Sequence, residues 1–142
     1  MARHFSLYRI CSYFLIVFCA LHTFGLLSRA SYGPGVDTVR SLMDTAGFTI
    51  MGSSVTWGGM YLGFGLLFSV FLLFSAFLAW YMGGLTGKGA APFLPVGWAL
   101  LVTFALVAGV SWAYFFIAPG AMATLIALLM AVGNVRTYIR VR

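Results

Sequence analysis

The stretch WGGMYLGFGLLFSVFLLFSAFLAWYMG, residues 57–83, decides the fold of this chain. It contains no charged residue, and it is longer than the roughly 20 apolar residues that cross a bilayer. Trp57, Trp80 and Tyr81 lie near its two ends, and tryptophan and tyrosine gather at both membrane–water interfaces. We therefore expect this stretch to form a transmembrane helix.

The rest of the chain has the same character. Of its 142 residues 63% are apolar and 7% charged, with a mean hydropathy of +1.05, whereas soluble domains are about 45–50% apolar and roughly 25% charged. Further apolar spans are expected at about 7–27, 95–117 and 119–138, and the first exceeds the apolar core of a signal peptide, so that an uncleaved anchor is expected. We predict an all-α integral membrane protein, with residues 1–142 forming a single four-helix antiparallel transmembrane bundle.

The charges predict the orientation of these spans. On one face of the four-span arrangement lie Arg3, Arg9, Lys88, Arg136, Arg140 and Arg142. The opposite connection, residues 28–56, is neutral because Arg29 and Arg40 are balanced by Asp37 and Asp44. Positive residues favour the cytoplasmic side, so both termini are expected there, in the cytoplasmic (inner) membrane of a bacterium. The net charge of +6 can also contact anionic lipids, and without a basic recognition motif it does not indicate nucleic-acid binding.

The external connection 28–56 is expected to hold a short amphipathic helix. Turn residues at 32–35 are followed by apolar residues on one side, Val36, Val39 and Met43, and charged residues on the other, Asp37, Arg40 and Asp44. Ser53, Ser54 or Thr56 is expected to cap the next helix. The charged residues are interpreted as two ion pairs in a solvated loop, with a gate at an external entrance as the alternative. The short helix is expected either to lie on the membrane surface or to dock on a partner protein.

Small residues form a stripe along the second span. Wound at 100° per residue, the stripe falls within an arc of roughly 40° and contains Gly58, Gly65, Ser69, Ala76 and Gly83. Helices associate in lipid through such close backbone approach, so the stripe predicts a helix–helix contact. Gly59 and Gly63 have a second GxxxG spacing beside it, which suits another neighbour.

The first and fourth spans show matching faces that we expect to converge on a common interior. The face of the first span is polar and carries Tyr8, Cys11, Ser12, Cys19, His22 and Thr23. The face of the fourth span carries Gly120, Thr124, Ala127, Ala131 and Asn134. The two cysteines lie about 12 Å apart along one helix, beyond the 7 Å limit for a disulfide, so they are expected to be packing residues and no metal site is expected.

His22 is the candidate for chemistry in the interior. It lies about 8 Å inside the outer end of its span, and an ionisable group there is a functional hypothesis by default. It could be an axial ligand of haem or chlorophyll, a hydrogen-bond donor in a quinone site with Thr23, Ser53 and Ser54, or a proton carrier. The alternative is a neutral imidazole bonded to a neighbouring helix, with no cofactor. A haem held by two histidines is not expected, because His4 is predicted on the other side of the membrane.

Two stretches, FSLYRICSYFLIVFCALHTFGLL and FTIMGSSVTWGGMYLGFGLLFSVFLLFSAFLAW, resemble a family of small, uncharacterised four-span bacterial membrane proteins that are DoxX-like in size and layout. The resemblance is carried by Leu21-His22-Thr23, Met51-Gly52-Ser53-Ser54 and Tyr61-Leu62-Gly63-Phe64-Gly65, and it ends at Gly83. The family pattern has an acidic residue after the tryptophan of the second span, where this chain has glycines. The resemblance implies the four-span fold and no particular activity.

Three functions follow as hypotheses. The first is a non-catalytic accessory subunit of a larger membrane complex, such as a respiratory or photosynthetic pigment–protein complex, in contact with lipids and other integral-membrane subunits. The second is a stand-alone binder of a lipophilic ligand such as a quinone or lipid. The third, a small membrane enzyme or transporter, is disfavoured because the spans contain no acid–base pair and no phosphate-binding, HExxH or CxxC motif.

Overall fold

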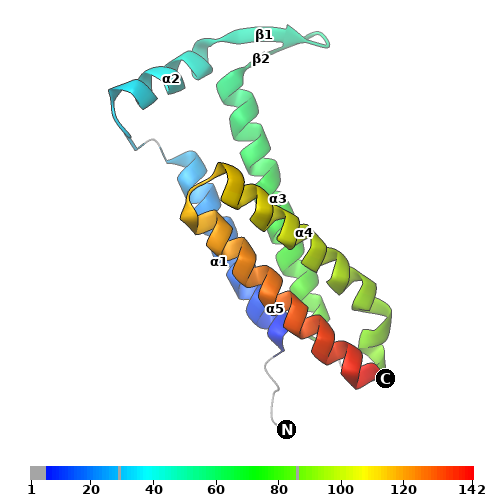
Figure 1. The fold of residues 1–142 in the computed structure, drawn as a ribbon. Helices are drawn as coiled ribbons and strands as arrows, with labels where there is room; N and C mark the ends of the chain where they lie inside the picture. Colours follow the sequence, from blue (N-terminus) through cyan, green and yellow to red (C-terminus); the bar gives the residue numbers. More distant parts are fainter. Residues whose placement is uncertain (1–5, 29, 86) are drawn as a thin grey trace. The chain divides into compact units, whose positions relative to one another are not determined.

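The computed structural model describes residues 6–28, 30–85 and 87–142 and is mainly helical (Figure 1). Arg3, His4 and Arg29 lie outside the described residues, as does the side chain of Lys88. In chain order the elements are α1 (Leu7–Leu27), α2 (Pro34–Thr45), β1 (Gly47–Ile50), β2 (Ser53–Thr56), α3 (Trp57–Met82), the 3-10 helix η1 (Gly87–Phe93), α4 (Leu94–Tyr114) and α5 (Ile117–Val141).

Four of these helices are long and apolar enough to cross a membrane: α1, α3, α4 with the end of η1, and α5. The prediction of four long apolar helices and one short amphipathic helix is thus confirmed at the level of secondary structure. The bounds of α1 are the predicted ones, and α3 ends at Met82. Helix α5 runs to Val141, beyond the expected end at Tyr138, because arginine is a good helix former and does not stop the last turn.

The break between α4 and α5 lies earlier than the sequence suggested. Phe115 and Phe116 are extended and separate the two helices, whereas the third span was expected to continue to Ile117. Pro119 explains the position of the break, because a proline ring clashes with the carbonyl four residues before it, here that of Phe115. Within the first turn of α5 the missing N–H of Pro119 costs no intrahelical bond.

The described chain divides into two compact units, residues 6–19 with 72–142 and residues 20–71. In the first unit, α5 folds back along α4. Trp112 donates to Thr124 near the connection, with 3.0 Å between Nε1 and Oγ1, and Gly97 lies against Asn134 toward the other end. The core of this unit is apolar and fully buried at Leu15, Leu72, Phe104, Ile126 and Met130.

The second unit contains a β-hairpin that was not predicted. Strands β1 and β2 pair antiparallel from Gly47 with Thr56 to Ile50 with Ser53. Met51 and Gly52 form the turn at φ 49° and 82°, and positive φ at both central residues is the mark of the type I′ turn that suits a two-residue hairpin. Thr56 then caps α3, accepting a hydrogen bond of 3.0 Å from Gly59 N.

The charged residues of α2 differ from expectation. Asp37, in the first turn of α2, accepts a hydrogen bond of 2.5 Å from Ser31 Oγ, and Arg40 donates to the carbonyl oxygen of Ala30 at 3.3 Å. Among the described residues, neither aspartate forms an ion pair with Arg40. Asp37 and Arg40 form hydrogen bonds with the preceding loop instead. The expected pairing of Arg40 is therefore replaced by bonds that fix the start of α2, and any pair of Arg29 lies outside the described residues.

Candidate functional site

His22 makes a hydrogen bond from α1 to α3 within the second unit. Its Nε2 lies 3.0 Å from the carbonyl oxygen of Gly65. A carbonyl only accepts, so Nε2 carries a proton and is the donor of this bond. The ring of Phe68 meets the imidazole edge to face at 5.1 Å, so aromatic packing also fixes the orientation of His22.

Thr23 makes a second bond between the same two helices. Its Oγ1 lies 2.8 Å from Ser69 Oγ, and Ser69 in turn donates to Gly65 O at 3.3 Å. Gly65 lets α1 approach, because a Cβ at this position would stand 2.5 Å from the nearest methyl of Leu26. Interhelical bonds of this kind contribute on average about 0.6 kcal/mol each in a membrane protein.

The other two residues of the predicted ligand site lie elsewhere. Ser53 and Ser54 are exposed in β2, and Gly65 lies about 13 Å along α3 from the end of that strand, at 1.5 Å per residue. The structure therefore brings His22 and Thr23 to α3 and leaves the serines in the hairpin. Two surface depressions are described in the second unit, and neither is lined by His22 or Thr23.

The bond to Gly65 bears on the chemistry of His22. An imidazole nitrogen that ligates a metal must offer a lone pair, and Nε2 here carries a proton that it donates to Gly65 O. Coordination of a haem or chlorophyll by this nitrogen would break the contact with α3. The arrangement seen is that of the alternative interpretation, an imidazole bonded to a neighbouring helix.

In the first unit, the polar face of α1 bonds to α3 and α5. Tyr8 donates to Asn134 Oδ1 at 2.6 Å, Ser12 donates to the carbonyl oxygen of Ala76 at 2.9 Å, and Cys11 Sγ lies 3.5 Å from the carbonyl oxygen of Ile126. All three donors are buried. The polar side chains of α1 thus serve helix–helix contacts at both ends.

Asn134 is fully buried in this unit, with an exposed fraction of 0%. Gly97 of α4 lies directly against its Oδ1, and Gly133 lies against the ring of Tyr8. Its Nδ2 has no hydrogen-bond partner among the described residues. The sequence placed Tyr8 and Asn134 on interior faces without singling them out. The available signal was a lone amide on a stripe of small residues.

The stripe of small residues on α3 contacts neighbouring helices along its length. Gly58 lies against Asp44, Gly65 against Leu26 and Gly83 against Arg9, while Ser69 and Ala76 O take the hydrogen bonds described above. We call Gly65, Ser69, Ala76 and Gly83 the closed face of α3, because α1 occupies the space in front of them.

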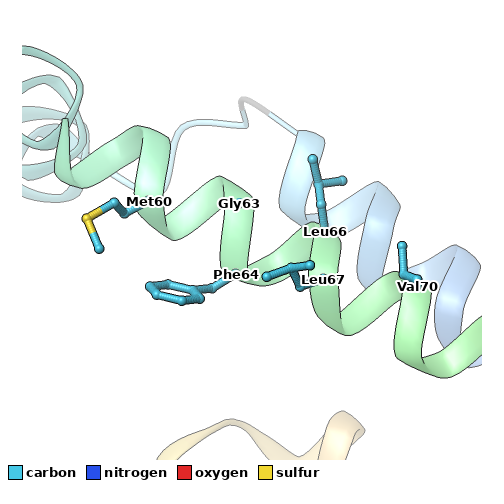
Figure 2. Close-up of a pocket in the computed structure, with 6 residues that line it drawn as sticks. All are labelled: Met60, Gly63, Phe64, Leu66, Leu67 and Val70. Atoms are coloured by element: carbon cyan, nitrogen blue, oxygen red, sulfur yellow. The ribbon is translucent and has the colours of Figure 1, made fainter. Parts of the chain in front are cut away.

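Gly59 and Gly63 form a second face, which we call the open face of α3. A Cβ on Gly63 would meet nothing within 4 Å, and one on Gly59 would meet only Thr56 of the preceding turn. Gly63 lies in a shallow apolar depression of about 460 Å³ on the same helix (Figure 2). It is lined by Met60, Gly63, Phe64, Leu66, Leu67 and Val70.

The described residues hold no group of three or more His, Cys, Asp or Glu that could bind a metal ion, and Cys11 and Cys19 are both buried. Comparison of the chain with protein-family models, with curated proteins and with solved structures finds no match. The likeness to the DoxX-like proteins therefore stays a prediction from the residues that carry it.

Proposed function

We propose that this chain is a non-catalytic subunit of a larger integral-membrane complex, and that the open face of α3 receives a helix of another subunit. The supporting observation is the contrast between the closed face and the open face of α3. The closed face is filled by α1, whereas Gly63 lines an apolar depression, and a Cβ on it would meet nothing within 4 Å among the described residues. Glycines at GxxxG spacing let two backbones approach closely in lipid, where association depends on van der Waals packing.

The use of the polar side chains favours the same function. A catalytic or transport site in a membrane needs ionisable or polar groups directed at a substrate. Here His22, Thr23, Tyr8 and Ser12 are all engaged in bonds between helices. Their arrangement suits a scaffold that holds its own helices together.

Affinity purification from native membranes in mild detergent tests the proposal. We expect the full chain to bring down one or more integral-membrane proteins in fixed stoichiometry, and Gly63→Leu to lose them, because the new side chain fills the depression. Gly109→Leu is the matched control, since a Cβ on Gly109 also meets nothing within 4 Å and the residue lies on α4. A wild-type protein that elutes as a free monomer with no partner would overturn the proposal.

We further propose that α1, α3, α4 and α5 span the cytoplasmic membrane of a bacterium as an antiparallel bundle with both termini inside. Six cations at the termini and the second connection, against a neutral connection 28–56, support this orientation. Ser53→Cys should react with a membrane-impermeant maleimide in intact cells, whereas Val141→Cys should react only after permeabilisation. The native cysteines are at most 6% exposed, so a wild-type blank should stay unlabelled. The reverse pattern would refute the orientation.

A further inference from the structure

One end of the first unit gathers its described cations. Arg9 lies in the first turn of α1, Arg136 and Arg140 lie in the last turns of α5, and Arg142 follows the end of α5. The bond between Tyr8 and Asn134 holds these two helix ends at the same level, as the ribbon also shows (Figure 1). We call these four arginines the basic end.

The basic end contains no acidic side chain to neutralise it. The chain has two acidic residues, Asp37 and Asp44, and both belong to α2 in the other unit. Cations near low-dielectric surroundings are retained when an anion or a polar group faces them. The first unit therefore supplies no acidic side chain as a counter-charge for the basic end.

Two members of this set lie over aromatic rings. The guanidinium carbon of Arg142 lies 4.4 Å from the centre of the Tyr138 ring at the same end of the chain, whereas the surroundings of Arg9 come from both α1 and α3. The guanidinium carbon of Arg9 lies 5.0 Å from the centre of the Trp80 ring, and Tyr13 meets the same ring edge to face at 5.8 Å. A Cβ on Gly83 would stand 2.5 Å from Arg9 Cγ, so the glycine is what lets the arginine stem lie against the end of α3. Nε of Arg9 is buried and has no hydrogen-bond partner in the described chain. Because Nε is buried, an anion can reach this fixed guanidinium only through its terminal nitrogens, whose planar arrangement suits the oxygens of a phosphate or carboxylate.

The surroundings of Arg9 indicate an anion that carries apolar chains. Tyr13, Ile16 and Phe77 follow from the Arg9–Trp80 pair along α1 and α3, and 46–63% of their side-chain surface is exposed. A free inorganic anion gains nothing from such a surface, whereas acyl chains bury it. Basic pockets at the end of membrane helices bind anionic headgroups in this way.

We propose that Arg9, stacked on Trp80, binds the phosphate of an anionic glycerophospholipid whose acyl chains lie along α1 and α3. Arg136, Arg140 and Arg142 add a general attraction for the same lipid class. The site requires α1 and α3 to span a membrane and does not depend on a protein partner at the open face of α3.

Native mass spectrometry of the full chain, titrated with dioleoyl phosphatidylglycerol and with dioleoyl phosphatidylcholine, tests the proposal. We expect the wild type to bind the first lipid more tightly. Arg9→Gln should lower this preference roughly five- to tenfold, since a charge near the headgroups and its ring contact are both lost. Arg9→Lys should lose most of it as well, because lysine keeps the charge but not the planar, stacked donor set.

Arg140→Gln is the matched control, because it removes the same charge from an exposed side chain of the basic end. We expect it to lower the preference by less than about threefold. Inorganic phosphate, compared with sodium chloride at equal ionic strength, should not displace the lipid, and displacement would identify a phosphate site instead. The proposal is overturned if the wild type shows no preference for phosphatidylglycerol over phosphatidylcholine. This measurement does not depend on whether any variant folds. The proposal is also overturned if Arg9→Lys behaves as the wild type, or if folded Arg9→Gln and Arg140→Gln lose equal amounts.

Discussion

Gly63 and Gly65 lie on the same turn of α3 and have opposite surroundings. Gly65 belongs to the closed face, where Leu26 packs against it and its carbonyl oxygen accepts from His22. Gly63 belongs to the open face and meets nothing within 4 Å. The comparison teaches that a glycine in an apolar helix permits close approach of another backbone. Whether a helix packs there depends on the position of the neighbouring helix.

Gly65→Leu should break the closed face most strongly. The added side chain would occupy the volume of the Leu26 methyls, and overpacking of this kind costs typically 1–3 kcal/mol, so we expect the free energy of unfolding to fall by about 3 kcal/mol. SDS titration in detergent micelles followed by far-UV circular dichroism measures it. Gly63→Leu is the matched control, with an expected change within about 0.5 kcal/mol. Equal losses in the two variants would contradict the distinction between the faces.

Gly83→Ala tests the other end of the closed face. The new methyl would collide with Arg9 Cγ and lie 3.1 Å from Arg9 N, and a backbone atom cannot swing away as a side-chain end can. We expect a loss of about 2 kcal/mol in the same titration. Gly109→Ala, at an open position of α4, should show no loss, and a tolerated Gly83→Ala would mean that Arg9 does not pack there.

His22→Leu sharpens the role of the bond that crosses the closed face. Losing one interhelical hydrogen bond should lower the free energy of unfolding by about 1 kcal/mol, within the 0.6–1.7 range measured for such bonds. Leu21→Ala, at the neighbouring exposed residue, is the control.

The visible absorption of protein from native membranes should be the same for the wild type and His22→Leu, since Nε2 is bonded to Gly65. A haem or chlorophyll band that vanishes in the variant would instead make His22 a ligand.

Gly63→Ala has the smallest expected effect and the opposite sign. A methyl group at this position enters open space, and alanine in a helix is more favourable than glycine by roughly 0.5–1 kcal/mol. We expect the isolated protein in detergent to become more stable by that amount. A destabilised Gly63→Ala monomer would show that the open face is already occupied within this chain.

The sequence predicted the long helices well because each of them consists of a long run of mainly apolar residues. Apolar side chains over more than 20 residues leave no other structure possible in lipid, and the bounds of α1 agree with the prediction. The hairpin was missed because its strands have four residues each, too few for an alternating pattern to stand out. The informative signal was the Met51-Gly52 pair, a two-residue turn ending in glycine, with β-branched residues at Thr49-Ile50 before it and at Val55-Thr56 two residues after it.

The candidate site was predictable in part. The 3.6-residue period placed Tyr8, Ser12, His22 and Thr23 on one face of α1, and the structure bonds all four to other helices. Their partners were not predictable, because the rotation of α3 and α5 about their axes depends on packing that the sequence of one helix does not contain. The serines of the hairpin were assigned to the same site because the connection 28–56 was expected to lack strands.

The two-residue connection between α4 and α5 has a consequence for how the chain is made. With Phe115 and Phe116 as the only link, the two helices meet at the smallest cost of loop closure. Their contacts form between residues close in sequence, which favours rapid assembly. During synthesis α4 and α5 can pair as a preassembled hairpin, and the bond between Tyr8 and Asn134 then joins α5 to α1, which is made before it.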